Sequence, residues 1–492
     1  MSDAPPLGIV RRLLDRLNAD GIVYCHWKSN QHFRDALSGK DDLDILIDRA
    51  RYDRVMGILH SLSFKHFYVP PARSYVGIED FLGFDPEQGK LVHLHLHSQL
   101  VVGEKHLKGF LLPIESDVLG QRRFDESLGV YMSSRFHELL LLILRLGMKV
   151  RKRDFFKSSM LSGSTKAEFD WLKEGCPDFS DALQRTAWLT PRLKQSVLEV
   201  FGGDVSWWRV TRLKHQLYAD LAPWSRGSGL HNIWSRTRRE IARIVLEIQK
   251  RYLHTLYPFT RRRAATGGLT LAFLGSDGAG KSSAIAEIHR WLREFMDVRV
   301  FYLGSGDGSS SLLRLPLKWC LEFAKKRKLV KTSNNFSDSS LKEVGNRKLS
   351  LARKLWIYAL STERIGKLLA ASRCRLRGYV VLTDRYPQAE FPGLCDGPRL
   401  PDDTGFAGKK EAECFRLAGL CPPDLVVKLI VPPEVAVRRK PGEVDFETSR
   451  NLTERVKQIR FSSHTECVEI DAAQKQEAVW LAIKNAIWNA MG

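Results

Sequence analysis

Cysteine is scarce in this sequence, and no hydrophobic stretch is long enough to cross a membrane. The 8 cysteines are scattered along 492 residues without any C-x-x-C pair, which excludes a dense disulfide framework and predicts reduced thiols. The longest apolar run, Leu139–Leu144, falls far short of the roughly 20 residues that a membrane-spanning helix needs. Residues 1–25 carry polar and charged side chains where a secretory signal would be apolar. Together these absences predict a cytoplasmic protein that is soluble or at most peripheral to a membrane.

Internal repeats and low-complexity tracts are also missing, so the chain is expected to fold into ordinary globular domains. Its length predicts two or three such domains, because 492 residues are too many for one hydrophobic core. Hydrophobic residues make up 43% of the chain, which excludes a disordered or fibrous protein. Acidic residues are outnumbered, 56 against 77 lysines and arginines, and the net charge is +21. This charge favours an anionic partner: a nucleotide, a phosphorylated sugar, nucleic acid or acidic lipid headgroups.

The pattern of hydrophobic residues divides the chain into three parts. Residues 1–110 mix helical and strand-like segments, and residues 111–265 are dominated by helical periodicity and are basic. A cluster of proline, arginine and glycine between Pro258 and Gly268 marks the boundary to residues 266–492. There, short apolar strands alternate with helices, as a parallel sheet covered on both faces requires. The strand candidates are Leu269–Leu274, Val298–Leu303, Tyr379–Thr383, Leu425–Val431 and Val468–Ile470.

A phosphate-binding loop follows the first of these strands. Residues Gly275–Ser282 fit G-x-x-x-x-G-K-[ST] at every fixed position, between a strand and an amphipathic helix. The glycines allow successive N–H groups to turn toward phosphate oxygens, and the helix N-terminus adds positive charge. Lys281 is expected to bind the terminal phosphates and Ser282 the Mg²⁺ ion. The alternative is a glycine-rich turn that binds nothing. The predicted ATP-binding residues are Gly275, Ser276, Asp277, Gly278, Ala279, Gly280, Lys281, Ser282 and Ser283.

Two further polar elements follow later strands of the same part. Asp384 and Arg385 come directly after the apolar run Val380–Leu382, at the edge of a parallel sheet where ligands bind. Asp384 is predicted to hold Mg²⁺ or to orient an acceptor, and Arg385 to bind an acceptor phosphate. A capping aspartate paired with a neighbouring arginine is the alternative. Arg438 and Arg439 follow the fourth strand and are predicted to neutralise the transferring phosphoryl group, or else form a solvated charged face.

These motifs resemble the thymidylate kinase family of P-loop nucleotide kinases. The elements similar to that family's motifs are, in chain order, Gly275–Ser283, Asp384-Arg385-Tyr386, Pro423–Leu425 with Val431–Ala436, and Asp471–Ala473. The resemblance covers residues 269–492 and implies a five-stranded parallel nucleotide-kinase fold that uses ATP and Mg²⁺. It also implies a lid with arginines near Arg438 and Arg439, and it places Asp277 near the acceptor and its metal.

Where the family binds its acceptor, this sequence departs from the family's pattern. Residues 303–308 stand in place of the R-E-P-G element, and Pro387–Phe391 in place of the S-x-x-A-Y-Q stretch. These positions recognise the thymine nucleotide, so thymidylate is disfavoured, and a nucleoside monophosphate or a sugar phosphate is the expected acceptor. A basic insert between the second and third strands, Arg314–Lys354, predicts either a solvated face or a surface for an anionic membrane or polymer.

A second candidate site lies in residues 1–110. Asp42 and Asp44 occupy alternate positions of an expected strand, so both carboxylates share one face. Together with Ser29 upstream, this D-x-D pattern resembles the nucleotidyltransferase-like fold, which implies that the two aspartates hold Mg²⁺. The candidate strand that would supply a third carboxylate has histidines instead: His93, His95 and His97. We expect them either to bind a transition metal with the aspartates or to form the polar face of a half-exposed strand.

The sequence as a whole predicts an α/β protein with a P-loop nucleotide-kinase sheet of five parallel strands. An α+β nucleotidyltransferase-like domain and a helical connector precede this sheet. The expected reaction transfers the γ-phosphoryl group of ATP to a small phosphorylated or hydroxyl acceptor. The alternative is a nucleotide-gated binding or assembly factor, peripheral to a membrane and linked to surface-polysaccharide biosynthesis. Nucleic acid is disfavoured because no groove-binding motif is present, and the oligomeric state, including a homodimer, stays open.

Overall fold

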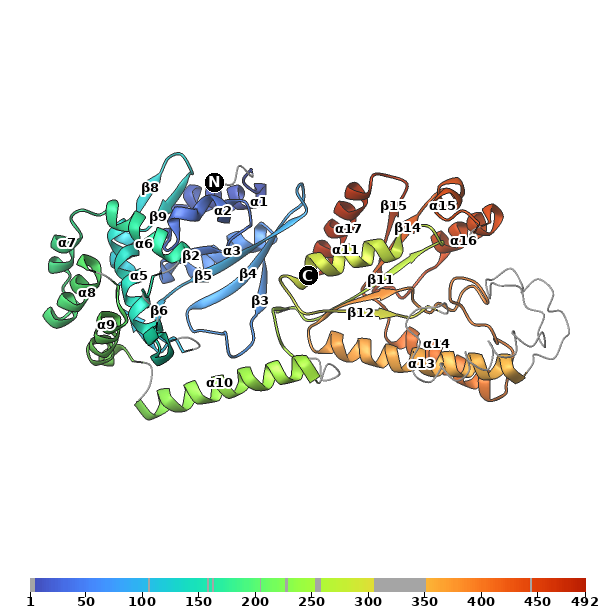
Figure 1. Ribbon diagram of the computed structural model, residues 1–492. Coiled ribbons are helices and arrows are strands. Elements are labelled where there is room, and N and C mark those ends of the chain that lie inside the picture. The colour runs from blue at the N-terminus through green and yellow to red at the C-terminus, as the bar shows by residue number, and fades with distance from the viewer. Residues whose placement is uncertain are drawn as a thin grey trace. The chain divides into compact units, whose positions relative to one another are not determined.

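The chain forms two compact units, Met1–Thr260 and Arg261–Gly492, in a computed structural model (Figure 1). Both units combine helices with a β-sheet, which confirms the predicted α/β class. The residues described are 5–104, 107–156, 159–161, 163–203, 205–225, 229–252, 258–304, 351–442 and 445–492. Most of the basic insert that begins at Arg314 lies outside them. Within these ranges all cysteines are free thiols, and no helix is long and apolar enough to span a membrane.

The first unit contains a mixed sheet in which the strands lie in the order β3-β4-β5-β2-β1-β9-β8. β2 is parallel to β5 and β1 to β9, and β4 is antiparallel to β5. The strands are β1 (Tyr24–His26), β2 (Leu43–Ile47), β3 (Lys65–Tyr68), β4 (Ile78–Asp85), β5 (Lys90–His97), β8 (Arg123–Asp125) and β9 (Val130–Met132), beside the hairpin of β6 (Leu100–Val102) and β7 (Phe110–Leu112).

The two faces of this sheet are covered by different sets of helices, because successive side chains of a strand point in opposite directions. Ile45 of β2 packs in the core that contains α1 and α3, whereas its neighbour Leu46 packs in the core that contains α5. Asp44 lies two residues before Leu46 and therefore shares its face. The helices near the sheet are α1 (Gly8–Ala19), α2 (Phe33–Leu37), α3 (Tyr52–Ser61) and α4 (Glu115–Gly120).

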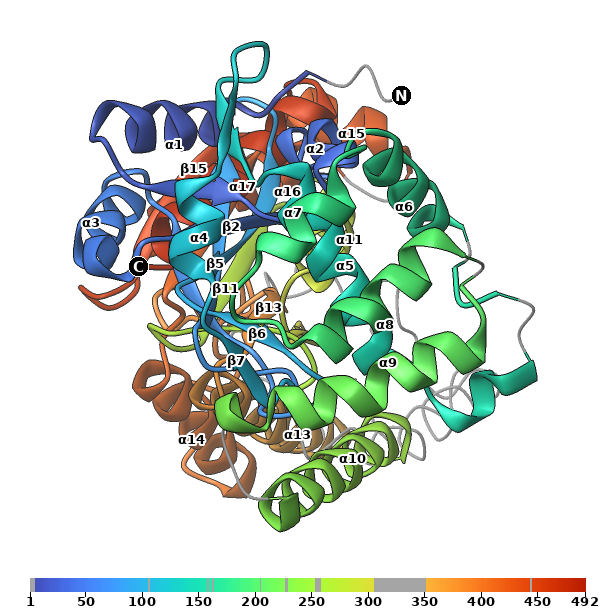
Figure 2. The ribbon, with the colours of Figure 1, turned by 90° about the vertical axis from the view of Figure 1, so that its left-hand side faces the viewer.

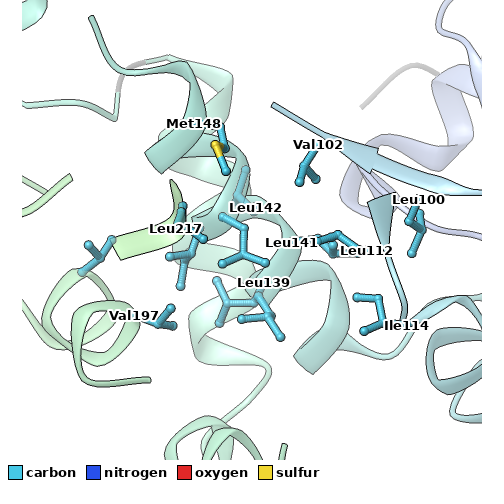
Figure 3. Packing of buried hydrophobic residues seen from close by; sticks show 14 of the residues in the cluster. Leu100, Val102, Leu112, Ile114, Leu139, Leu141, Leu142, Met148, Val197 and Leu217 are labelled. Atoms are coloured by element: carbon cyan, nitrogen blue, oxygen red, sulfur yellow. The ribbon is translucent and has the colours of Figure 1, made fainter. Parts of the chain in front are cut away.

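After the strands of the sheet, the chain of the first unit forms a layer of helices (Figure 2). Its central helix is α5, where Ser134 accepts a hydrogen bond from the His137 N–H and the run Leu139–Leu144 is buried (Figure 3). Gly147 permits close packing with α9, since an added Cβ would lie 2.7 Å from Leu217. The helices of this layer are α5 (Arg135–Lys149), α6 (Ser164–Glu174), α7 (Phe179–Arg185), α8 (Pro191–Gly202) and α9 (Trp207–Asp220), and α10 (Gly229–Tyr252) follows them in the chain.

The first unit differs from the expectation in the strands that it adds. β8 and β9 lie within residues 111–265, where the sequence predicts mainly helices, and β9 joins the N-terminal sheet beside β1. Each of these strands has 3 residues, which is too short for an alternating pattern to be recognised. β4 is also absent from the expected strands, and it contributes a residue to the polar cluster described below.

The second unit has the predicted all-parallel sheet, in the order β12-β13-β11-β14-β15. Helices α11 and α17 lie over one face, and α13 and α14 over the other (Figure 1). The strands are β11 (Leu269–Gly275), β12 (Val298–Tyr302), β13 (Val380–Asp384), β14 (Leu425–Ile430) and β15 (Glu466–Asp471), with the short β10 (Arg263–Ala264) before them. The helices are α11 (Lys281–Arg293), α13 (Leu351–Leu376), α14 (Phe406–Leu420), α15 (Pro433–Arg439), α16 (Phe446–Gln458) and α17 (Gln476–Ala490).

Candidate functional site

The phosphate-binding loop connects β11, the central strand of the parallel sheet, to the first turn of α11. Gly278 and Gly280 have φ angles of 86° and 90°, a backbone conformation that other residues rarely adopt. At Gly278 a side chain is excluded a second time, because a Cβ would lie 2.9 Å from the carbonyl oxygen of Ala436. The loop backbone therefore depends on glycine at these positions, as a cradle of N–H groups requires.

Lys281 is the first residue of α11, and its side chain is buried beneath the loop. Its Nζ donates hydrogen bonds of 2.9 Å to the carbonyl oxygens of Gly275 and Ser276 and lies 3.7 Å from an oxygen of Asp277. Burial, reinforced by the positive charge of Arg385, lowers the pKa of Lys281 to about 8. The ammonium group is thus held at the loop by two neutral carbonyl oxygens, which an anionic phosphate group can replace.

Asp384 ends β13, directly beside the end of β11, as the predicted parallel pairing requires. Its carboxylate interacts with the Ser282 side chain, and its Oδ1 atom is buried and has no hydrogen-bond partner among the residues described. Burial raises the pKa of this carboxyl group. A hydroxyl and an unpaired carboxylate oxygen beside a phosphate-binding loop suit Mg²⁺, which prefers oxygen ligands and retains water. Asp384 and Ser282 are therefore the residues that fit this ion.

Arg385 lies at the mouth of the loop between two carboxylates. It donates a 2.7 Å hydrogen bond to Asp277 and a 3.2 Å hydrogen bond to Asp396. Burial opposes the charge of Arg385, but Asp396 and Asp277 outweigh it and raise the pKa of the guanidinium group. With a φ of 68°, Arg385 also has a backbone conformation that is uncommon outside glycine. The cation is therefore held in one position next to the loop.

Asp396 and Arg364 are site residues that the sequence does not reveal. Asp396 is 3% exposed, and besides Arg385 it pairs with Arg364 of α13 at 2.6 Å. Burial would raise the pKa of Asp396, but the two arginines outweigh it and lower it. Neither residue belongs to a recognisable motif, and the three members of this ion-pair network are brought together only by the fold.

The two arginines after β14 are placed differently by helix α15. Arg439 donates a 2.9 Å hydrogen bond to the carbonyl oxygen of Ala472 and a 3.4 Å hydrogen bond to that of Gly278. It thereby connects the phosphate-binding loop to the turn after β15. Arg438, its neighbour, is exposed on the same helix. The structure thus brings Arg439 to the loop by its contacts, while Arg438 shares only the helix.

A surface groove of about 840 Å³ lies beside the loop, between the ends of β14 and β15 and helix α16. Val431, Thr453 and Asp471 are among its lining residues. The Thr453 hydroxyl lies 3.3 Å from that of Ser276, which connects the groove to the loop. Asp471, the first residue of the Asp471–Ala473 turn, thus lines a groove whose Thr453 contacts the loop residue Ser276.

We expect the affinity for ATP to depend on the charge of Lys281. A positive charge favours phosphate binding, and the pKa of about 8 means that the free protein loses this charge above that pH. The affinity should therefore be constant near neutral pH and fall by up to about tenfold per pH unit above pH 8. Titration calorimetry at several pH values measures this decline. The Lys281→Ala variant should bind weakly without it, and the same decline in that variant would contradict the assignment.

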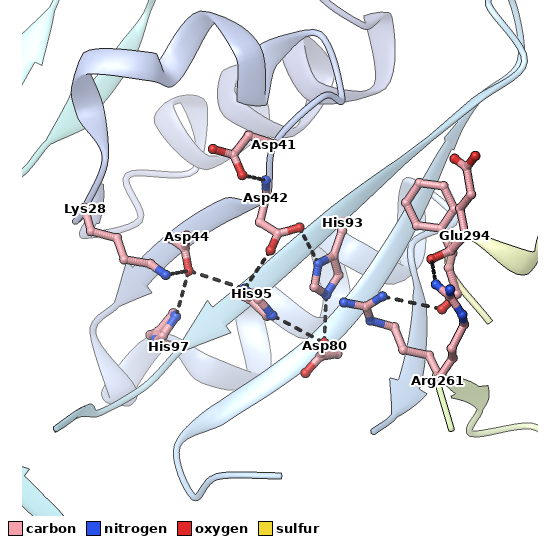
Figure 4. Close-up of polar contacts among 12 residues, drawn as sticks. Lys28, Asp41, Asp42, Asp44, Asp80, His93, His95, His97, Arg261 and Glu294 are labelled. Carbon is pink, nitrogen blue, oxygen red and sulfur yellow. Dashed lines mark hydrogen bonds and ion pairs between the residues drawn. The ribbon is translucent and has the colours of Figure 1, made fainter. Parts of the chain in front are cut away.

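A second polar cluster lies on the sheet of the first unit (Figure 4). Asp44 on β2 is paired in register with His95 on β5, and His95 is paired with Asp80 on β4. Neighbouring strands thus supply three polar side chains to one face, and Asp80 is the third carboxylate, which the sequence does not place. The expectation of a half-exposed strand is wrong, since His93 and His97 are buried among the carboxylates.

The acidic and basic groups of this cluster neutralise one another in part. Lys28 Nζ lies 2.9 Å from Asp44, and His97 Nε2 lies 3.3 Å from the same oxygen. Burial lowers the pKa of His97 to about 4. Burial also lowers the pKa of His95, but the hydrogen bonds and negative charges of Asp44 and Asp80 have the larger effect and raise it to about 9. The predicted residues Asp42 and Asp44 therefore belong to one side-chain cluster of the first unit.

Comparison with known proteins relates the chain to ATP-binding proteins. The protein is 28% identical over 213 residues to the uncharacterized ATP-binding protein YghR of Escherichia coli K12, covering 41% of this chain and 80% of YghR. It is also 29% identical over 180 residues to the uncharacterized ATP-binding protein YghS of the same strain, covering 35% of this chain and 73% of YghS. The relationship is distant and partial. No protein-family model matches the chain.

Proposed function

We propose that the second unit binds ATP at the loop Gly275–Ser282 and transfers its γ-phosphoryl group to a small phosphorylated acceptor. The observation that carries this proposal is the convergence of the glycine-dependent loop, Lys281 and the Ser282–Asp384 pair at one edge of the parallel sheet. Two distant relatives are named ATP-binding proteins, and this supports ATP as the nucleotide.

Each residue has a distinct part in the proposed reaction. The phosphoryl group leaves the oxygen that bridges the β- and γ-phosphates and bonds to an oxygen of the acceptor. Loop N–H groups and Lys281 bind the phosphates, and Ser282 and Asp384 hold Mg²⁺, which supplies positive charge when bound. Arg439, already in contact with the loop, would neutralise charge that develops on the transferring group. Arg438 would join it only if helix α15 turns toward the phosphates.

Arg385 is the proposed anchor for the acceptor's phosphate. It lies at the loop mouth, where Asp277 occupies part of its guanidinium group in the structure described. A phosphate can replace an aspartate because both present paired oxygens to the planar guanidinium. Asp277 would then be released to interact with the acceptor hydroxyl or the metal. The departures from thymidylate-kinase motifs favour a nucleoside monophosphate other than thymidylate, or a sugar phosphate.

An acceptor screen tests this function. Purified protein, ATP and Mg²⁺ are incubated with a panel of nucleoside monophosphates and sugar phosphates, and the transferred phosphate is measured. We expect at least one acceptor to be phosphorylated by the wild type. Binding of ATP without transfer to any acceptor would contradict the kinase assignment and leave an ATP-binding protein.

Helix α10 favours a second candidate function, a nucleotide-gated factor that binds an anionic lipid surface. Its stripe of exposed apolar side chains includes Ile241, Ile244 and Ile248, with exposed fractions of 55%, 52% and 47%. The same helix has five arginines and one lysine against two glutamates. An exposed apolar face on a basic helix is typical of attachment to anionic membrane surfaces.

Co-sedimentation with vesicles tests the lipid-binding candidate. We expect full-length protein to sediment with phosphatidylserine-containing vesicles more than with neutral ones, and the double substitution Ile244→Glu and Ile248→Glu to reduce this by about tenfold. Leu420→Glu is the matched control, since Leu420 is 65% exposed and lies in the second unit. Equal sedimentation of both variants, or no difference between vesicle types, would contradict the candidate.

A further inference from the structure

The histidine–carboxylate cluster of the first unit has ligand atoms that converge on one point. Asp42, His93 and His95 each offer one such atom, and these atoms all lie within 4.8 Å of one another. They come from two adjacent strands: β5 supplies both histidines, and Asp42 immediately precedes β2. This cluster belongs to a different unit from the phosphate-binding loop.

Both histidines turn the same ring nitrogen toward Asp42 (Figure 4). His93 Nδ1 lies 2.6 Å from Asp42 Oδ1. His95 Nδ1 lies 3.6 Å from Asp42 Oδ2 and 3.3 Å from Asp44 Oδ1. On the far side of both rings, Asp80 Oδ1 lies 2.7 Å from His93 Nε2 and 3.4 Å from His95 Nε2. The single carboxylate of Asp80 therefore contacts Nε2 of both imidazoles, and their Nδ1 atoms face Asp42.

This arrangement is how proteins orient histidines that bind metals. A ligating imidazole usually donates its other N–H group to a carboxylate, which fixes the ring and raises the basicity of the ligand. Two imidazole nitrogens and one carboxylate oxygen form a ligand set typical of Zn²⁺ and similar transition metals, whereas Mg²⁺ prefers oxygen ligands alone. His95 on β5 is paired in register with Asp44 on β2. A carboxylate at the position of His95 would favour Mg²⁺, whereas its imidazole nitrogen favours a transition metal.

Asp42 can adjust to an ion, while the neighbouring Asp44 is already engaged. Ligands of tetrahedral Zn²⁺ lie about 3.3 Å from one another, so Asp42 must withdraw from His93 by less than about 1 Å. Its side chain is 43% exposed at the start of the strand, which leaves room for this shift. Asp44, in contrast, is 8% exposed and contacts Lys28. We propose that Asp42, His93 and His95 bind one divalent transition-metal ion, oriented by Asp80, with Zn²⁺ as the probe.

Zinc binding to the full-length protein tests the proposal. The protein is treated with a chelator and dialysed, and titration calorimetry with Zn²⁺ should then show one tight site per chain that Mg²⁺ does not occupy. We expect His95→Gln and Asp42→Asn each to weaken this site by at least about 100-fold, and Asp80→Asn by about 10- to 100-fold. Unchanged affinity in the first two variants, absence of a tight site, or equal competition by Mg²⁺ would overturn it.

Two controls separate metal binding from general effects. The first control is His66→Gln. His66 lies outside the cluster and also faces a carboxylate, since its Nε2 is 3.9 Å from Glu79. This variant should bind Zn²⁺ as the wild type does. Asp42 is the primary variant because it is half-exposed, and circular dichroism confirms that the variant is folded. Co²⁺ bound at the proposed site should absorb without a thiolate charge-transfer band, and such a band would assign the metal to cysteine instead.

Discussion

Lys281→Ala is expected to lower kcat/KM for ATP-dependent phosphoryl transfer by about a thousandfold. The substitution removes a charge that is held beneath the loop by two carbonyl oxygens. In the proposed reaction this charge binds the terminal phosphates of ATP. Loss of one preorganised group that stabilises developing charge typically costs about 10²–10³ in rate, and Lys281 also contributes to ground-state binding of ATP. Steady-state kinetics with the acceptor identified in the screen measures the effect.

Lys410→Ala is the control for this experiment. Lys410 is also a lysine near the beginning of a helix, but it pairs with Glu413 on the surface of α14. It should retain wild-type kinetics, and a thermal unfolding curve should show that both variants are folded. Phosphoryl transfer by Lys281→Ala within about tenfold of the wild type would refute the role of the loop.

Asp396→Ala is expected to destabilise the second unit by about 3–5 kcal/mol. The substitution leaves Arg364 buried without its carboxylate partner, and an uncompensated charge in the interior is expensive. It also removes one of the two carboxylates that hold Arg385 at the loop mouth. Hydrogen exchange measured for peptides of β11 and β13 reports the free energy of unfolding of this unit separately from the first.

The destabilisation should depend on pH in a defined direction. The arginines hold the pKa of Asp396 below its ordinary value, so its stabilising effect is complete above the unfolded-state pKa of about 4. This contribution is lost as the pH falls through the lower pKa of the folded state, and the wild type and variant should then converge. Glu413→Gln, which alters an exposed pair, should change stability little at any pH. An equal effect of both substitutions would show that the Asp396 network does not support the fold.

The phosphate-binding loop could be predicted from the sequence because its chemistry is local. Gly278, Gly280, Lys281 and Ser282 are nearly consecutive, and their roles follow from backbone conformation and the start of one helix. Asp384 could also be placed, since an acidic residue at the end of an apolar parallel strand lies at the ligand-binding edge. The all-parallel sheet of the second unit is confirmed for the same reason: its strands are apolar runs separated by helices.

In the first unit the sequence predicts only part of the polar cluster. Asp42, Asp44 and the alternate histidines indicated a polar face, but the partner that orients His93 and His95 is Asp80 on β4, whose register the sequence does not specify. Strand pairing is a non-local property, set by which apolar faces can be buried together.

From the sequence alone, therefore, one can predict a glycine-dependent loop that fits the phosphate-binding pattern, the parallel sheet behind it and the paired aspartates of a second polar site. Only the tertiary structure decides that Asp396 and Arg364 hold Arg385 in place, and that Asp80 turns two imidazoles toward Asp42. The physical reason is that backbone conformation depends on neighbouring residues, whereas the geometry of charged side chains depends on elements distant in the chain that pack into one core.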